Sequence, residues 1–182
     1  MSNIEIERKY FINPNNIESI LKKSVSMYQI KQGYLFNSKI LTIRLRMRNR
    51  YCNNGQKLLD KEAFLTIKGK AKGFSVPEYE YKIPTFIAKF FLKICGTVIE
   101  KYRYIIYENS NTWELDIFKG NHKGLIVAEI ELKSEDQEFS IPEWFGQYLE
   151  VSEDSRFRNA VLIGLSKNKV EELIKDTLEK LC

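Results

Sequence analysis

Hydrophobic and charged residues alternate along most of this chain, so that neighbouring residues fall on opposite faces of an extended segment. Near the N-terminus, Ile4 and Ile6 share one face, while Glu5, Glu7 and Lys9 share the other. A period of two predicts a β-strand with one apolar and one polar face. The alternation, with turn residues between its runs, predicts eight strands, over residues 4–11, 26–36, 39–50, 63–70, 78–83, 98–107, 112–118 and 125–132.

Helical patterns lie at the margins of these strands. Asn16 is a suitable cap for a short helix to residue 21, and Pro84 fits the first turn of a helix that runs to about residue 94. The tail from residue 155 onward is predicted to be helical, with its last helix over about 168–181. The polar stretch 52–61 is predicted to be a loop. We expect one domain of the α+β class over residues 1–182, because no repeat or linker interrupts it.

Composition narrows the class of protein. The chain has 182 residues, 43% of them hydrophobic and 29% charged, which excludes a disordered, collagen-like or coiled-coil chain. No apolar run approaches the roughly 20 residues of a membrane span, and the N-terminus has no signal-peptide core. Cys52, Cys95 and Cys182 form no CxxC motif, which argues against a disulfide framework or a zinc site. We therefore expect a cytoplasmic protein with no membrane partner.

The positions of the charges are more informative than their sum. Lysine and arginine total 29 against 24 acidic residues, and a net charge of +5 indicates only a solvated surface or a weak preference for polyanions. On one strand, a row of charges is explained by a half-exposed sheet. Here the row recurs in strand after strand, with both signs: Glu5, Glu7, Lys9, Arg44, Arg46, Lys68, Glu80, Lys101, Arg103, Glu114, Asp116, Glu129, Glu131 and Lys133.

A sheet that curls or closes to protect its edges offers a second explanation for these rows. Its apolar faces would pack outward, and its charged faces would line a central cavity. Like charges crowded there repel and lose hydration, so they need a counter-ligand. Clustered cations favour a multiply charged anion, and clustered carboxylates favour a hard divalent metal. A polyphosphate with bound Mg²⁺ or Mn²⁺ satisfies both requirements.

Eight short motifs follow one another along the chain. They are Glu5-Ile6-Glu7-Arg8-Lys9, Arg44-Leu45-Arg46, Thr66-Ile67-Lys68, Glu78-Tyr79-Glu80, Lys101-Tyr102-Arg103, Trp113-Glu114-Leu115-Asp116, Ala128-Glu129-Ile130-Glu131-Leu132 and EVSEDSRF at residues 150–157. In type and in order they resemble the ExExK, RxR, TIK, ExE, KxR, WxxD, AEIEL and EVTxDxRY motifs of the CYTH superfamily, the triphosphate tunnel metalloenzymes. The resemblance covers nearly the whole chain.

This resemblance implies a closed antiparallel β-barrel of eight strands, a tunnel with peripheral helices. The tunnel would hold a triphosphate and one or two divalent ions, and family members usually hydrolyse the triphosphate. The resemblance also implies that the C-terminal helix caps one end of the tunnel. The chain departs from the family pattern at Val76, where the family often has arginine, at Lys82, where it often has an acid, and at Ser152, where it often has threonine.

The chemistry of a phosphoanhydride assigns roles to the charged residues, because its hydrolysis needs charge neutralisation and in-line placement of a nucleophile. The candidates for gripping phosphate oxygens are Lys9, Arg44, Arg46, Lys68, Lys101, Arg103, Arg156 and, less directly, Lys133. The candidates for binding metal are Glu5, Glu7, Glu129 and Glu131, with Asp116 and Asp154 completing the shell. Catalytic roles are assigned to Lys9, Glu80 and Glu129, of which Glu80 would position the attacking water.

The leading hypothesis is therefore a metal-dependent hydrolase of inorganic triphosphate or a nucleoside triphosphate. A class IV adenylate cyclase, a thiamine triphosphatase and a non-catalytic polyphosphate-binding protein remain alternatives, since all use the same triphosphate grip. A nucleic-acid partner is not expected, because aromatic residues alternate away from the cations and the interleaved carboxylates would repel a phosphate backbone. The sequence leaves the oligomeric state open, a homodimer included.

Overall fold

The computed structural model describes the chain over residues 3–13, 17–38, 40–52, 57–70 and 75–181, while the side chains of residues 3–5 and 75–76 lie outside this description. Over these residues the chain forms one antiparallel sheet of nine strands. The strands are β1 (Asn3–Ile12), β2 (Ser26–Asn37), β3 (Thr42–Tyr51), β4 (Leu58–Lys68), β5 (Ser75–Ile83), β6 (Ile99–Glu108), β7 (Asn111–Phe118), β8 (Ile126–Leu132) and β9 (Tyr148–Glu150).

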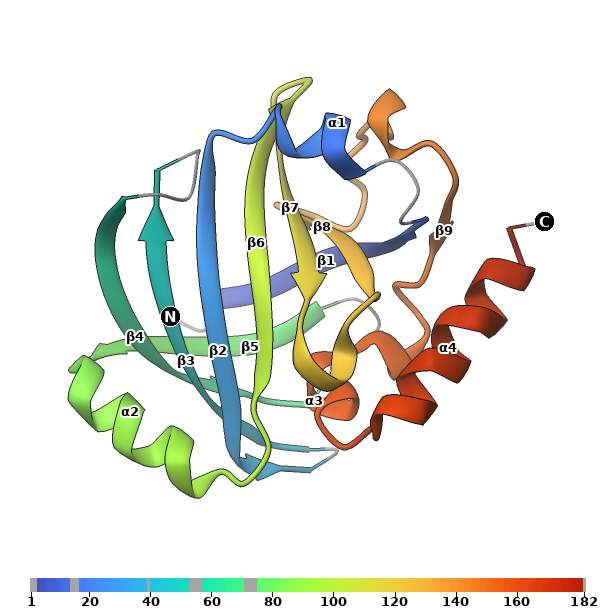
Figure 1. Cartoon of the computed structure of the whole chain (residues 1–182). Helices are drawn as coiled ribbons and strands as arrows, with labels where there is room; N and C mark the ends of the chain where they lie inside the picture. The colour runs from blue at the N-terminus through green and yellow to red at the C-terminus, as the bar shows by residue number, and fades with distance from the viewer. Residues whose placement is uncertain (1–2, 14–16, 39, 53–56, 71–74, 182) are drawn as a thin grey trace.

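The sheet curls back on itself. Its strand order is β5-β4-β3-β2-β6-β7-β8-β1-β9, with a further pairing between β5 and β1. That pairing is short, since it sets Asn3–Ile6 of β1 opposite Ser75–Glu78 of β5. In Figure 1, β1 and β5 cross behind β2 and β6, so the strands surround a common centre. The predicted antiparallel sheet with peripheral helices is thus confirmed.

Two details of the sheet differ from the prediction. The loop predicted over residues 52–61 is too long, because β4 begins at Leu58 and Asp60 lies opposite Arg50 of β3. The residues from Leu58 to Lys61 are all exposed, and the two adjacent leucines fall on opposite faces of the strand, so the backbone ladder continues without any apolar alternation to reveal it. The strand β9 was not predicted, because three residues are too few for a periodic signal.

The helices lie outside the sheet, as predicted. They are α1 (Ile17–Leu21), α2 (Thr85–Ile94), α3 (Asn159–Leu162) and α4 (Lys167–Glu179), with 3₁₀ turns η2 (Gly120–His122), η3 (Glu143–Phe145) and η4 (Ser155–Phe157). The predicted cap Asn16 is outside the described residues. Gly33 lets α2 approach β2, because an added Cβ there would lie 2.8 Å from Cβ of Cys95. In the described part of the chain, no helix has both the length and the apolar character to span a membrane.

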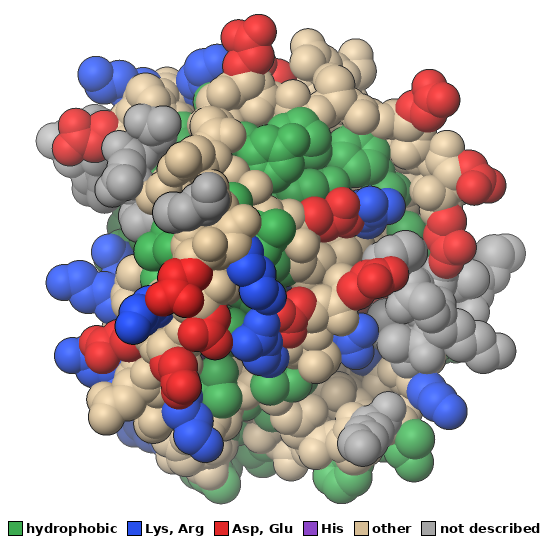
Figure 2. Space-filling view, turned by 90° about the vertical axis from the view of Figure 1, so that its right-hand side faces the viewer, with side chains coloured by type: hydrophobic (Ala, Val, Ile, Leu, Met, Phe, Trp, Pro, Cys, Tyr) green, Lys and Arg blue, Asp and Glu red, His purple; other side chains and the backbone are tan. Residues whose placement is uncertain are grey.

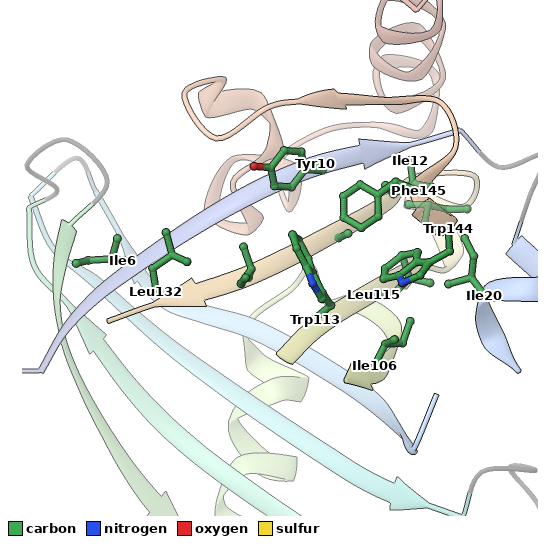
Figure 3. Packing of buried hydrophobic residues seen from close by; sticks show 13 residues of the cluster. Ile6, Tyr10, Ile12, Ile20, Ile106, Trp113, Leu115, Leu132, Trp144 and Phe145 are labelled. Carbon is green, nitrogen blue, oxygen red and sulfur yellow. The ribbon is translucent and has the colours of Figure 1, made fainter. Parts of the chain in front are cut away.

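The outer apolar cluster fixes which way the strands face. Tyr10 of β1, Trp113 and Leu115 of β7 and Ile130 of β8 are buried together on the outside of the sheet (Figure 3). The loop before β9 covers them with Phe145, whose ring centroid lies 4.9 Å from that of Trp113. Because alternate residues point to opposite faces, this packing turns the charged rows of the same strands inward.

A second apolar cluster closes one end of the interior, and we call it the plug. Four inward positions are hydrophobic where the charged rows of β1, β6, β7 and β8 end: Phe11, Ile99, Phe118 and Val127. They pack beneath buried side chains from β9 to α4, namely Val151, Phe157, Leu162, Val170 and Leu173. The chain after β8 therefore packs against the end of the charged interior.

Candidate functional site

The interior of the curled sheet contains two adjoining cavities. The larger has a volume of about 660 Å³, and the smaller about 380 Å³. Arg46, Arg103, Glu114 and Glu131 line both, so the two spaces form one polar channel. On the outer surface of the molecule that carries α4, basic and acidic side chains are intermixed (Figure 2). The larger volume is typical of a pocket for a small-molecule ligand.

Basic residues dominate the larger cavity. Among the described residues its wall contains seven lysines and arginines and four glutamates. The basic residues are Lys9, Arg44, Arg46, Lys68, Lys101, Arg103 and Arg158, and the acidic ones are Glu7, Glu114, Glu129 and Glu131. Most of them lie on strands that pair side by side: Arg103 is opposite Asp116, and Lys9 is opposite Glu129. The register therefore gathers onto one surface charges that are far apart in sequence.

Arg103 is at the centre of one ion-pair network. Its Nη2 atom donates a hydrogen bond to Glu129 over 2.6 Å, and its guanidinium donates to both carboxylate oxygens of Asp116 over 2.7 and 2.6 Å. Arg103 also donates to Glu114, and the buried Lys101 donates to Asp116. On the other side, Nζ of Lys9 donates to Glu129 over 2.5 Å. Asp116 is fully buried, so it supports the cations from beneath rather than facing the cavity.

The pKa values in this network reflect burial opposed by charge pairing. Burial alone would raise the pKa of Glu129, but Lys9, Arg103 and Lys101 hold it well below the usual value. Burial alone would lower the pKa of Lys9, but Glu129 and Glu7 raise it. For Lys101 burial prevails, and its pKa is lowered despite Asp116. Lys9 and Glu129 are thus held in their charged forms.

A second network joins β3, β4 and β5. Nη2 of Arg46 donates a hydrogen bond to Glu80 over 2.6 Å, and the hydroxyl of Thr66 donates to the same oxygen over 2.9 Å. Burial would raise the pKa of Glu80, yet Arg46 and the Thr66 hydrogen bond lower it overall. Nζ of Lys68 lies 2.8 Å from Glu78, whose other oxygen lies 3.5 Å from Arg44. The carboxylates Glu78 and Glu80 line the smaller cavity.

Two glutamates form the most suitable place for a metal ion. Glu7 of β1 lies directly opposite Glu131 of β8, and both line the larger cavity. Like charges at opposite positions of neighbouring strands repel, and Lys9 offsets this for Glu7 at 2.9 Å. In the described ranges, no three His, Cys, Asp or Glu residues form a group able to hold a metal. The pair therefore fits a cation such as Mg²⁺, which takes one or two carboxylates and completes its shell with water and phosphate oxygens.

The structure does not bring every predicted residue to the cavities. Arg156 lies outside both cavity linings; its guanidinium contacts Asp154 at 2.6 Å and Asp176 of α4 at 3.8 Å. Lys133 is exposed beyond the end of β8, where its backbone N–H donates to Gln137. The side chains of Glu5 and Val76 are outside the described part of the chain. Asp154, which contacts Arg156, also lines neither cavity, whereas the remaining predicted residues line the cavities or, in the case of Asp116, support them.

Several residues that line the cavities were not among the predicted site residues. Arg48, Glu78 and Glu114 extend the alternating rows, so the same period could have indicated them. Gln32 and Tyr34 of β2 line the larger cavity but carry no charge, and burial raises the pKa of Tyr34 to about 12, which keeps its hydroxyl protonated. The remaining additions, which include Arg158, come largely from the irregular segment after β9 and from the β2–β3 turn, where no period applies.

Comparisons with known proteins agree with this geometry. The family model of the CYTH domain matches residues 3–161. An inorganic triphosphatase of Acetivibrio thermocellus is 38% identical over 161 residues, which cover 87% of this chain and 92% of the relative. An inorganic triphosphatase of Nitrosomonas europaea is 33% identical over 162 residues, with coverages of 87% and 95%. The crystal structure of the inorganic triphosphatase NE1496 aligns with a TM-score of 0.57 at 30% identity, over 90% of this chain and 95% of that one.

Proposed function

Because the chain belongs to the CYTH family, we propose that it is a metal-dependent triphosphatase whose preferred substrate is inorganic triphosphate. The observation that carries the proposal is the larger cavity, where seven cationic side chains of the described residues surround about 660 Å³. A compact polyanion neutralises such a wall better than a monoanion does. Triphosphatase activity of two relatives at 38% and 33% identity supports the same conclusion.

The cations that would hold the triphosphate are already in position. Carboxylates orient Lys9, Lys68 and Arg103 toward the cavity before any ligand arrives. Arginine offers bidentate contacts to phosphate oxygens, and lysine offers a point charge. Since the side chains are fixed in advance, less conformational entropy is lost on binding. The proposed grip comprises Lys9, Arg44, Arg46, Lys68, Lys101 and Arg103.

We propose that Glu7 and Glu131 hold the metal, as Mg²⁺ or Mn²⁺, together with Glu5 as the sequence suggests. When bound, the metal would supply charge neutralisation on the phosphate oxygens. Water attacks the terminal phosphorus and passes a proton to the surrounding water, while the bond from that phosphorus to the bridging oxygen breaks and negative charge develops on that oxygen of the departing pyrophosphate. Lys9 and Arg103 stabilise this charge, and Glu129 keeps both of them in place.

Glu80 is the candidate for positioning the attacking water. It lines the smaller cavity next to Arg46, and its lowered pKa keeps it an anion and therefore a hydrogen-bond acceptor near neutral pH. Lys133, Asp154 and Arg156 have no part in this proposal, because none of them belongs to either cavity lining. The cytoplasmic location, and the choice between monomer and homodimer, stay predictions from the sequence.

The test is phosphate release from triphosphate, ATP, thiamine triphosphate and a longer polyphosphate, with Mg²⁺, with Mn²⁺ and with a chelator. We expect metal-dependent turnover that is fastest with triphosphate and is abolished by Glu131→Gln. The matched control is Glu138→Gln, which removes the same charge at an exposed position after β8. Cyclic AMP and pyrophosphate from ATP would identify a cyclase instead. Fastest turnover of thiamine triphosphate would identify a thiamine triphosphatase, and tight binding without turnover would identify a binding protein.

A further inference from the structure

Arg158 differs from the other cations that line the larger cavity in the described part of the chain. The remaining six, Lys9, Arg44, Arg46, Lys68, Lys101 and Arg103, each lie within 4.0 Å of a carboxylate. Arg158 lines the same cavity from the segment between η4 and α3 and is exposed. Its guanidinium makes no ion pair with any other residue that the structure describes.

The backbone around Arg158 is held firmly at the edge of the cavity. Its carbonyl oxygen accepts hydrogen bonds from the N–H groups of Val161 and Leu162 over 2.8 and 2.9 Å. Phe157 and Leu162, on either side, are buried in the plug. Two residues further on, the carbonyl of Ala160 accepts a hydrogen bond of 2.6 Å from Nδ2 of Asn37 at the end of β2. The segment thus joins the plug to the wall of the sheet, and Arg158 reaches the cavity from this junction.

We propose that Arg158 is a further substrate-binding residue, which contacts the phosphate of the triphosphate nearest the plug. The inference rests on the proposed function. A cation already paired with a carboxylate gives up part of that interaction when a phosphate approaches, whereas Arg158 has no carboxylate partner among the described residues to give up. Arg158 belongs to the segment that packs into the plug. A ligand that contacts both Arg158 and the cations of the strands therefore also connects the plug to the sheet. The triphosphate would therefore stabilise the fold by mass action partly through this residue.

The chain offers a closely matched control in Arg156. It lies in the same segment, with the same side chain, but it contacts Asp154 and Asp176 on the side of α4 and is outside both cavity linings. Asp154 also caps η4 by accepting from the backbone N–H of Arg156, a bond that survives loss of the arginine side chain. Arg156→Ala therefore removes one positive charge from the segment without removing it from the cavity.

The experiment compares the wild type with Arg158→Ala, Arg158→Lys and Arg156→Ala. Triphosphate affinity is measured by calorimetric titration and by the rise in melting temperature, both in chelator, and kcat and KM are then measured with Mg²⁺. We expect Arg158→Ala to weaken affinity and raise KM about tenfold with kcat changed less than about twofold. Arg158→Lys should recover much of the loss, and Arg156→Ala should stay within about twofold of the wild type. The difference between Arg158→Ala and wild type should shrink as salt is raised, since the guanidinium is exposed.

Two results would overturn the inference while leaving the proposed function intact. One is wild-type affinity and KM in Arg158→Ala. The other is an equal loss in Arg158→Ala and Arg156→Ala, which would assign the effect to the charge of the segment as a whole. If the wild type neither binds nor hydrolyses triphosphate, the proposed function fails first and the inference fails with it. Melting temperatures without ligand show whether each variant is folded, and Arg158→Gln replaces Arg158→Ala if that variant is not.

Discussion

The two cavities of the channel share four wall residues and yet differ in charge. The larger carries seven basic and four acidic side chains, whereas the smaller carries three arginines and four glutamates beside Tyr28, Ile30 and Ile105, counted over the described residues. A polyanion is therefore attracted to the larger cavity and repelled by much of the smaller one. The same alternating rows thus build two different environments, and the register of the strands decides which one each charge enters.

The supports beneath the cations differ as well. In the larger cavity, Lys101 and Arg103 rest on Asp116, which is completely buried, and Lys101 itself is only 2% exposed. In the smaller cavity, Arg48 is held by Glu62, which also pairs with Lys82, a side chain that is 66% exposed. Charge pairs removed from water interact more strongly than exposed pairs, which solvent screens. We therefore expect the larger cavity to be the more rigid of the two.

Removal of the supporting carboxylate of each cavity should give the largest effect that distinguishes the two cavities. Asp116→Ala should lower the free energy of unfolding by about 3–5 kcal/mol, because it leaves Lys101 buried without its carboxylate. Glu62→Ala should cost about 1 kcal/mol or less, because water reaches its partners. Urea denaturation at neutral pH measures both values. Equal losses would contradict the difference in rigidity.

The next test compares two arginines of the same strand. Arg44 lines only the larger cavity, and Arg48 only the smaller, four residues further along β3. Arg44→Ala should lower kcat/KM for triphosphate by about 10²–10³-fold, the usual cost of losing one positioned donor to a developing charge. Arg48→Ala should lower it by about tenfold or less, because its guanidinium lies over the Phe64 ring, 4.6 Å from the centroid, and pairs with Glu62. An equal loss in both variants would mean that the substrate extends into the smaller cavity.

Much of the fold was predictable from the sequence, since one face of most strands is packed against a core. The outward residues of β1, β7 and β8 form one buried cluster, and this is why a clear period of two marks these strands. The signal fails where both faces are exposed, as at Leu58–Lys61, and where a strand has three residues, as in β9. The period also gives no information on His122 of η2, which is buried and whose Nε2 atom lies 2.7 Å from the carbonyl oxygen of Leu162. Such a partner, 40 residues away, is set by tertiary packing.

The candidate site was predictable to the same extent and for the same reason. Once the face of a strand is fixed, the direction of Arg44 or Glu129 follows from its position in the alternation. The irregular segment after β9 has no period, so its sequence did not distinguish Arg156, which contacts Asp154, from Arg158, which lines the cavity. Nor did charge patterning indicate Tyr34, an uncharged residue of the larger cavity.

The smallest test uses pH to examine the smaller cavity alone. The pKa of Glu80 is lowered, since Arg46, Thr66 and Arg44 outweigh the opposing effect of burial. A carboxyl group with a lowered pKa in the folded state adds stability above its unfolded value, near 4.5, and loses it as the pH falls through the folded value. Between pH 5 and pH 3, the wild type should therefore lose more stability than Glu80→Gln, which keeps the size of the side chain and an oxygen to accept from Thr66.

The expected difference is about 1 kcal/mol or less, because the Glu80 side chain is 29% exposed and water screens its pairs. Urea midpoints at each pH measure it, and Glu138→Gln, at an exposed position, should follow the wild type. If Glu80→Gln instead follows the wild type, then Arg46 does not hold Glu80 in its charged form. Glu80 would then become neutral at a higher pH. The smaller cavity would carry less negative charge between pH 5 and pH 3 than its four glutamates indicate, and it would repel a polyanion less over that range.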